Sequence, residues 1–148
     1  KTLKYSYKKN SLSMKNLFIF CLFFSLIACQ SKEEILYQQY VVEGRVTYEK
    51  NCSNCHQSDG SGLRDLYPPL AKTDLWKRIK PEQLACILKQ GQKGEIKVNG
   101  KSYSGYMPAN AKLEAIDIAE LITFMKDSWG DKKIYSFDEA RTALKNCR

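Results

Sequence analysis

Histidine is nearly absent from this sequence, since the 148 residues contain one, His56. Acidic residues are absent from the first 28 positions. Apolar runs are short as well, and none reaches the roughly 20 residues that a membrane-spanning helix needs. Methionine is scarce, with three in the chain. Because each scarcity leaves few candidates, the positions of the remaining histidine, methionines and apolar segments carry most of the functional information.

The lack of acidic residues near the start makes the chain look more basic than its main part is. The formal charge is +8, but five lysines precede Cys29 and no acidic residue does. From Cys29 onward the chain has 19 basic and 16 acidic residues, a net charge of only +3. So small an excess removes the case for a nucleic-acid partner.

The longest apolar run, Leu17 to Ala28, is followed directly by Cys29. With about a dozen residues it is too short for a bilayer span and is typical of a signal-peptide core. Its Leu-Ile-Ala-Cys ending resembles a bacterial lipobox. This predicts that residues 1–28 are a leader and lipoprotein signal peptide, and that Cys29 is acylated and anchors the mature protein to a membrane. An uncleaved membrane anchor is the alternative.

Both interpretations of the leader place the rest of the chain outside the cytoplasm, facing the periplasm. Gln30, directly after Cys29, resembles a signal for sorting to the outer membrane. Residues 29–38 are polar and predict a lipid-anchored linker, which leaves residues 39–148 as one compact domain.

Six cysteines in an exported chain suggest a disulfide framework, so each one needs a role. Cys21 lies in the apolar run of the leader, and Cys29 takes the lipid. Two more stand in a C-x-x-C-H motif. The remaining pair, Cys86 and Cys147, is predicted to form a disulfide.

The C-x-x-C-H motif consists of Cys52, Cys55 and His56. Two thiols three positions apart near a helix end can each add to one vinyl group of a porphyrin. The adjacent imidazole then lies under the iron as an axial ligand. This motif is typical of c-type haem attachment, and the export signal places it in the compartment where attachment occurs. The sequence therefore predicts one covalently bound haem c.

Three other interpretations of the motif remain open. A redox-active dithiol would be expected in a thioredoxin-like alternation of strands and helices, which the pattern lacks. A structural zinc site would need a fourth ligand, Cys86 or Cys147, and would require adjacent Cys55 and His56 to reach one tetrahedral ion. The third is a plain disulfide from Cys52 to Cys55 beside a surface histidine.

Apolar spacing predicts a helix just before the motif and another further along the chain. The first has Gly44 on its apolar face, where it would allow a close helix crossing. The second has Pro81 in its first turn and Gly91 just past its end, the usual start and stop residues. Between them the chain supplies three leucines suited to lining a haem edge or to ordinary core packing: Leu63, Leu66 and Leu70.

Two more helices and a hairpin are predicted in the second half. Asn99 and Gly100, flanked by apolar residues, predict a tight hairpin turn. Helical spacing continues from about residue 114 to 129, the longest of the predicted helices. Ser136 and Glu139 then form an S-x-x-E capping box, which predicts a short terminal helix.

With these elements in order, the segment from about Gly44 to Trp129 resembles the class I (mono-haem) cytochrome c family. That family has a first helix, C-x-x-C-H, a loop with proline, a middle helix, a methionine commonly followed by proline, and a last helix that crosses the first. The resemblance implies a small all-α fold of about four to five helices around one haem, here with a short hairpin insertion.

The resemblance also implies a second iron ligand, Met107, which precedes Pro108 and lies 51 residues after His56. Of the other methionines, Met14 is in the leader and Met125 belongs to the apolar pattern of the longest helix, where a core role is expected. Packing is the alternative for Met107 too. The family pattern further implies that a carbonyl near the Pro68-Pro69 pair accepts the proton of His56.

Four features depart from the family pattern. Glu114 and the residues before it stand where the family often has a Ser, Thr or Asp helix cap. The Cys86–Cys147 pair, the terminal helix and the hairpin lie outside the minimal pattern. They indicate a subgroup with its own insertion.

Ligation by His56 and Met107 would leave no open position on the iron, and methionine raises the reduction potential. The expected function is electron transfer between redox partner proteins, in a respiratory or other extracytoplasmic chain, and not enzymatic catalysis. Residues 72–101 hold eight basic and three acidic residues, which form either a docking rim for an acidic partner or a solvated surface. The alternatives are a haem subunit of a redox enzyme, or a gas sensor in which Met107 is displaced.

Overall fold

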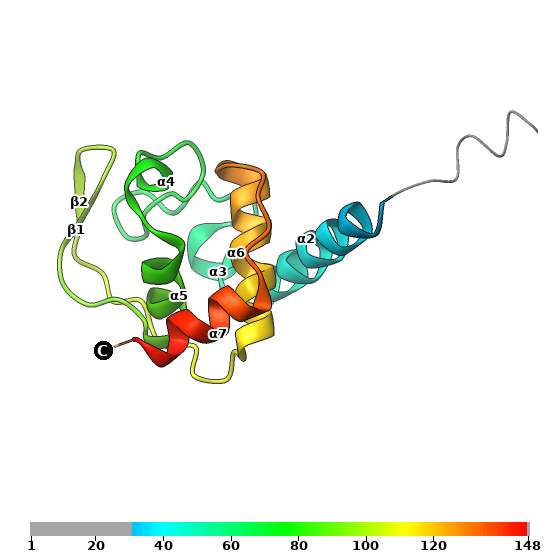
Figure 1. The fold of residues 1–148 in the computed structure, drawn as a ribbon. Helices are drawn as coiled ribbons and strands as arrows, with labels where there is room; N and C mark the ends of the chain where they lie inside the picture. Colours follow the sequence, from blue (N-terminus) through cyan, green and yellow to red (C-terminus); the bar gives the residue numbers. More distant parts are fainter. Residues whose placement is uncertain (1–30, 148) are drawn as a thin grey trace, which may run out of the picture. The chain divides into compact units, whose positions relative to one another are not determined.

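The computed structural model describes residues 31–147 (Figure 1). The predicted signal peptide and the predicted lipid site at Cys29 lie outside the described residues. The described elements are α2 (Lys32–Asn51), α3 (Ser53–His56), α4 (Leu75–Arg78), α5 (Pro81–Gln90), β1 (Ile96–Val98), β2 (Lys101–Tyr103), α6 (Ala115–Trp129) and α7 (Phe137–Lys145). The predicted helical fold with a small hairpin is confirmed. Across residues 31–147 no helix is long and apolar enough to cross a membrane.

Helix α2 begins at Lys32, so residues 32–38 are helical where the sequence suggested a linker. Lysine, glutamate, leucine and glutamine favour the helix there. A long-range contact also holds this part of α2, because the Tyr37 hydroxyl donates to Asp127 Oδ1 on α6 at 2.7 Å.

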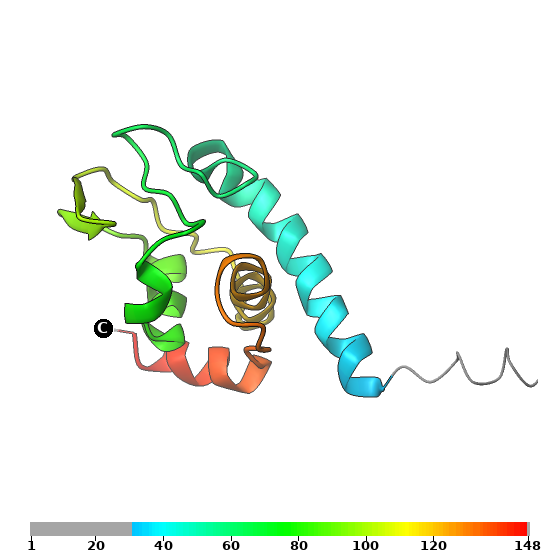
Figure 2. The same cartoon turned by 90° about the horizontal axis from the view of Figure 1, so that it is seen from above.

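Helices α2 and α6 cross closely at Gly44. A Cβ on Gly44 would lie 2.1 Å from the Glu120 carbonyl oxygen and 2.7 Å from Phe124 Cβ. The same face of α2 buries Val41 and Tyr48. Figure 2 shows α2 running beside α6, which is seen nearly end-on. The predicted close crossing at Gly44 is confirmed.

Helix α6 forms the centre of the core, where Ile118, Leu121 and Ile122 are fully buried. It begins without a Ser, Thr or Asp cap. Instead the Glu114 N–H donates to Asp117 Oδ2 at 2.7 Å, so a carboxylate from inside the first turn satisfies the N–H group that precedes the helix.

Helix α7 packs against both α5 and α6. Its predicted capping box is confirmed, since the Ser136 N–H donates to Glu139 Oε2 at 2.8 Å and the Glu139 N–H donates to Ser136 Oγ at 3.3 Å. A disulfide joins Cys86 on α5 to Cys147, just past the end of α7, with a Cα–Cα distance of 5.4 Å.

Strands β1 and β2 form the predicted hairpin. Its turn residues Asn99 and Gly100 have φ values of 51° and 78°, the left-handed conformation that an Asn-Gly turn adopts readily. Asn99 also ties the hairpin to the start of α4. The Asp74 N–H donates to Asn99 Oδ1, and the Asn99 N–H donates to Asp74 Oδ1, both at 2.9 Å.

Candidate functional site

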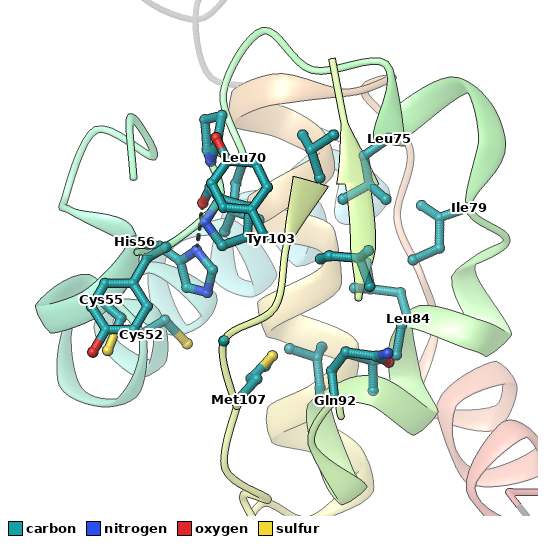
Figure 3. Close-up of a pocket in the computed structure, with 18 of the residues that line it drawn as sticks. Cys52, Cys55, His56, Leu70, Leu75, Ile79, Leu84, Gln92, Tyr103 and Met107 are labelled. Atoms are coloured by element: carbon teal, nitrogen blue, oxygen red, sulfur yellow. Dashed lines mark hydrogen bonds between the residues drawn. The ribbon is translucent and has the colours of Figure 1, made fainter. Parts of the chain in front are cut away.

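A cavity of about 370 Å³ lies between the α2–α3 junction, α5, the hairpin and the loop before α6 (Figure 3). Apolar side chains from these segments, from the loop between α3 and α4, from α4 and its end, and from α6 form most of its wall: Leu66, Leu70, Leu75, Ile79, Leu84, Ile87, Leu88, Val98 and Met125. Two of the three leucines proposed as lining are among them. The third, Leu63, is 38% exposed and does not line the cavity.

All four predicted site residues, Cys52, Cys55, His56 and Met107, line this cavity. Figure 3 shows them around the same space, although Met107 comes from a segment far along the chain. The local fold that places the first three is one helical turn. The Cys52 N–H donates to the last turn of α2, at the Tyr48 carbonyl, at 2.8 Å, and the His56 N–H donates to the Cys52 carbonyl at 2.9 Å.

Both motif cysteines are free thiols. Burial raises the pKa of the Cys52 thiol to about 11, and the neighbouring Cys55 adds to this effect. Redox-active dithiols need the opposite, a lowered pKa that exposes a thiolate. The redox-dithiol and plain-disulfide interpretations of the motif therefore lose support.

His56 is held in one orientation by its ring nitrogen. Nδ1 lies 3.0 Å from the Pro68 carbonyl oxygen and donates to it, which leaves the Nε2 lone pair free. Burial lowers the pKa of His56, while the bond to Pro68 acts in the opposite direction. A neutral, oriented imidazole with one free nitrogen is the form that ligates a metal.

A glycine lets the loop approach His56 this closely. Gly62 has φ of +70°, and a Cβ there would lie 2.5 Å from the Tyr67 carbonyl oxygen and 2.7 Å from Pro68 C. The Gly62 N–H also donates to the His56 carbonyl at 2.9 Å. The loop therefore contacts both the ring and the backbone carbonyl of His56.

Met107 has no helix or strand of its own, but its backbone pairs with Gln92. The Met107 N–H donates to the Gln92 carbonyl, and the Gln92 N–H donates to the Met107 carbonyl, both at 3.0 Å. Met125, which was expected in the core, is 2% exposed on α6 and also reaches the cavity wall.

The zinc interpretation loses its fourth ligand, because Cys86 and Cys147 are bonded to each other. Among residues 31–147, no group of three or more histidine, cysteine, aspartate or glutamate side chains is arranged to hold a metal ion. What remains is an apolar cavity with two thiols, one neutral imidazole and two thioethers at its wall.

A family model for cytochrome c matches residues 41–129, more than half of the chain. The chain belongs to the cytochrome c family. The match begins within α2 and ends with α6, so the hairpin lies inside it and α7 lies beyond it. The class I c-type cytochromes carry electrons on covalently attached haem c, and this is the cofactor of the chain.

Two relatives share the cytochrome c region. Over 90 residues the chain is 37% identical to cytochrome c-552 of Thermus thermophilus, a match that spans 58% of this chain and 69% of that protein. Over 93 residues it is 34% identical to the cytochrome c subunit of a quinone alcohol dehydrogenase from Gluconacetobacter polyoxogenes. That second match spans 62% of this chain but only 19% of the subunit.

The cavity of this cytochrome fits haem. Its wall is apolar, as a porphyrin face requires, and its sulfur and nitrogen donors match the groups that attach and ligate haem c. Sequence patterns found these donors but missed most of the wall. Val98 and Tyr103, diagonal neighbours on the two strands of the hairpin, carried a spacing signal that could have found them. Leu75 on α4 and Ile79 just past its end did not, because this helix is too short to show a period.

Proposed function

We propose that the chain is an electron-transfer protein whose haem c is attached through Cys52 and Cys55 and ligated by His56 and Met107. The observation that carries the proposal is that all four side chains line one apolar cavity. When bound, haem supplies a one-electron redox centre. The chain attaches it, orients the proximal imidazole through Pro68 and keeps water from its faces.

Ligation at both axial positions supports electron transfer over gas binding, because it leaves no vacant site on the iron. The test uses the two methionines at the cavity wall. The absorption spectra of the reduced, haem-loaded wild type and Met125→Leu should not change when carbon monoxide is added. The spectrum of Met107→Ala should change, because this variant should bind the gas. Rapid binding by the wild type would contradict the closed site and support a gas sensor.

We further propose that residues 1–28 are removed, that Cys29 is acylated, and that the domain works outside the cytoplasm, anchored to a membrane. Support comes from the lipobox-like sequence and from the attachment motif, which belongs to exported cytochromes. A Cys29→Ser variant should lose metabolic labelling with palmitate. Unchanged labelling would contradict acylation at Cys29.

The partners are proposed to be redox proteins. Apolar side chains at the cavity edge are exposed, with Leu66 at 63% and Tyr106 at 59%, and Lys93 Nζ lies 5.8 Å from the centre of the Tyr106 ring. An apolar patch with a basic neighbour suits transient docking of a protein with an acidic rim.

A second candidate is a haem subunit of a redox enzyme. It is favoured by the likeness to the cytochrome c subunit of a quinone alcohol dehydrogenase. Purification of the chain from its native membrane separates the two candidates. Recovery in a stoichiometric complex with a dehydrogenase would favour the subunit, and recovery alone would favour an independent carrier.

A further inference from the structure

Met107 lies in the segment between β2 and α6, which has no helix or strand of its own. A ligand on such a segment stays at one place only if neighbouring groups fix it. In this structure the fixing contacts come from the C-terminal end of α5, through Lys89, Gly91 and Gln92.

The backbone pair between Gln92 and Met107 is possible because of Gly91. This residue ends α5 with φ of +78°, and a Cβ there would lie 2.3 Å from the Met107 carbonyl oxygen and 2.8 Å from the Ala109 nitrogen. The absence of a side chain therefore lets the segment pass directly over the helix end.

Lys89 holds the same segment further along. Its Nζ donates to the Ala111 carbonyl at 2.8 Å and to the Leu113 carbonyl at 2.7 Å. Leu113 is buried, so the ammonium connects the helix to a fixed point of the core. The Met107 segment is then held at two places, by the backbone of Gln92 and by the side chain of Lys89.

We propose that Lys89 is a positioning residue that keeps the Met107 thioether at the iron. The inference rests on the proposed ligation by Met107. Lys89 is one of the eight basic residues in the segment 72–101, but its charge is used inside the molecule, on two backbone carbonyls, and not for docking. Loss of this clamp leaves the backbone pair with Gln92 as the nearest restraint on the ligand.

The test measures how easily imidazole, an added ligand, displaces the methionine in haem-loaded ferric protein. Lys89→Met should bind imidazole about tenfold more tightly than the wild type, the fold-change expected when a charged hydrogen bond is lost. Its sulfur-to-iron charge-transfer absorption should weaken. Lys89→Arg, which keeps charged donors, should lie between the two.

Lys112→Met is the matched control, because Lys112 is exposed and lies between the two residues whose carbonyls Lys89 binds. This variant removes one positive charge close to the same two carbonyls and should bind imidazole as the wild type does. Equal imidazole affinity in the wild type, Lys89→Met and Lys112→Met would overturn the inference. An equal rise in both methionine variants would also overturn it, because charge alone would then be the cause.

If Lys89→Met does not fold, Lys89→Gln keeps one uncharged donor and should show a smaller rise in imidazole affinity. A wild-type value there would overturn the inference. Failure of the proposed ligation would be seen separately, in Met107→Ala. If that variant keeps the wild-type charge-transfer absorption, Met107 is not the ligand, whatever Lys89 does.

Discussion

At Gly44 a single hydrogen atom, in place of a side chain, decides how closely two helices pack. Gly44→Ala would place its Cβ against the Glu120 carbonyl and Phe124, so α2 and α6 would have to separate. We expect the free energy of unfolding to fall by about 1–3 kcal/mol, the usual cost of overpacking. Urea unfolding of the haem-loaded protein measures it.

The control for this substitution is Val46→Ala on the same helix. Val46 is 57% exposed, so its truncation should change stability by less than about 0.5 kcal/mol. Equal stability of Gly44→Ala and the wild type would show that the crossing adjusts without cost.

Single residues with restricted chemistry could be identified from the sequence. Cys52, Cys55 and His56 were predicted as site residues because few side chains bond to a porphyrin vinyl group or to iron, and the fold brings all three to one cavity. The pairing partners of ordinary side chains could not be found in this way. Lys89 looked like one more surface charge until the fold placed two carbonyls within its reach.

At the scale of elements, the hairpin depends on contacts with its neighbours, because two strands of three residues are not stable alone. The pKa of the Asp74 carboxyl lies below its ordinary value of 3.8. The larger cause is the hydrogen bond from the Asn99 N–H, and the hydrogen bond from Arg78 is the next. Because the folded pKa is the lower one, the contact is fully present above pH 3.8 and is lost as the pH falls through the folded pKa.

An NMR titration of the Asp74 carboxyl carbon should therefore give a midpoint below 3.8. In Arg78→Met the midpoint should rise but stay below that value, since the larger cause, the Asn99 N–H, remains. A wild-type midpoint at or above 3.8 would contradict the Asp74–Asn99 contact.

The disulfide fastens α7 to α5 at a point remote from the site, since neither Cys86 nor Cys147 lines the haem cavity. The two cysteines are 61 positions apart, and replacing both by serine removes the restriction that their bond places on the unfolded chain. The free energy of unfolding should fall by about 2–4 kcal/mol. The haem absorption spectrum should stay unchanged. Guanidinium unfolding and absorption on the same sample measure the two effects, and a changed spectrum would show that the helices transmit the loss to the site.

Elements were predictable where periodicity or caps mark them, as for α5, α6 and α7. The four-residue helix α4 is too short to show a period. The early start of α2 was missed because its first two turns face solvent and carry little apolar pattern. Its contact to α6 through Tyr37 depends on a partner 90 positions away.

At the scale of the whole molecule, the net positive charge is small. We therefore expect the rate of reaction with a charged oxidant to depend on charges near the cavity more than on the total charge. Lys93 lies at the cavity edge beside Tyr106, so Lys93→Glu should slow oxidation of the reduced protein by ferricyanide, a small anion, at low ionic strength. Lys133→Glu makes the same charge change outside residues 72–101 and should have a smaller effect. Equal slowing in both variants would favour a solvated surface over a docking rim.

The arrangement of the chain around one cavity could be anticipated from the order of motifs, because order along the chain is what the cytochrome c family shares. The hairpin's place in the cavity wall could not. It follows from the contact between Asp74 and Asn99, which joins positions 25 apart through side chain and backbone.

The disulfide also requires that the cysteines pair selectively while the protein matures. Four cysteines that reach an oxidising compartment can be fully paired in three ways, and each of the three consumes the thiols that haem attachment needs. The proposed attachment through Cys52 and Cys55 requires the Cys86–Cys147 bond to form while these two thiols stay reduced. Cys147 follows Cys55 by 92 positions, so in a chain exported from its N-terminus the attachment motif would emerge before the last cysteine, and before either residue could pair with it.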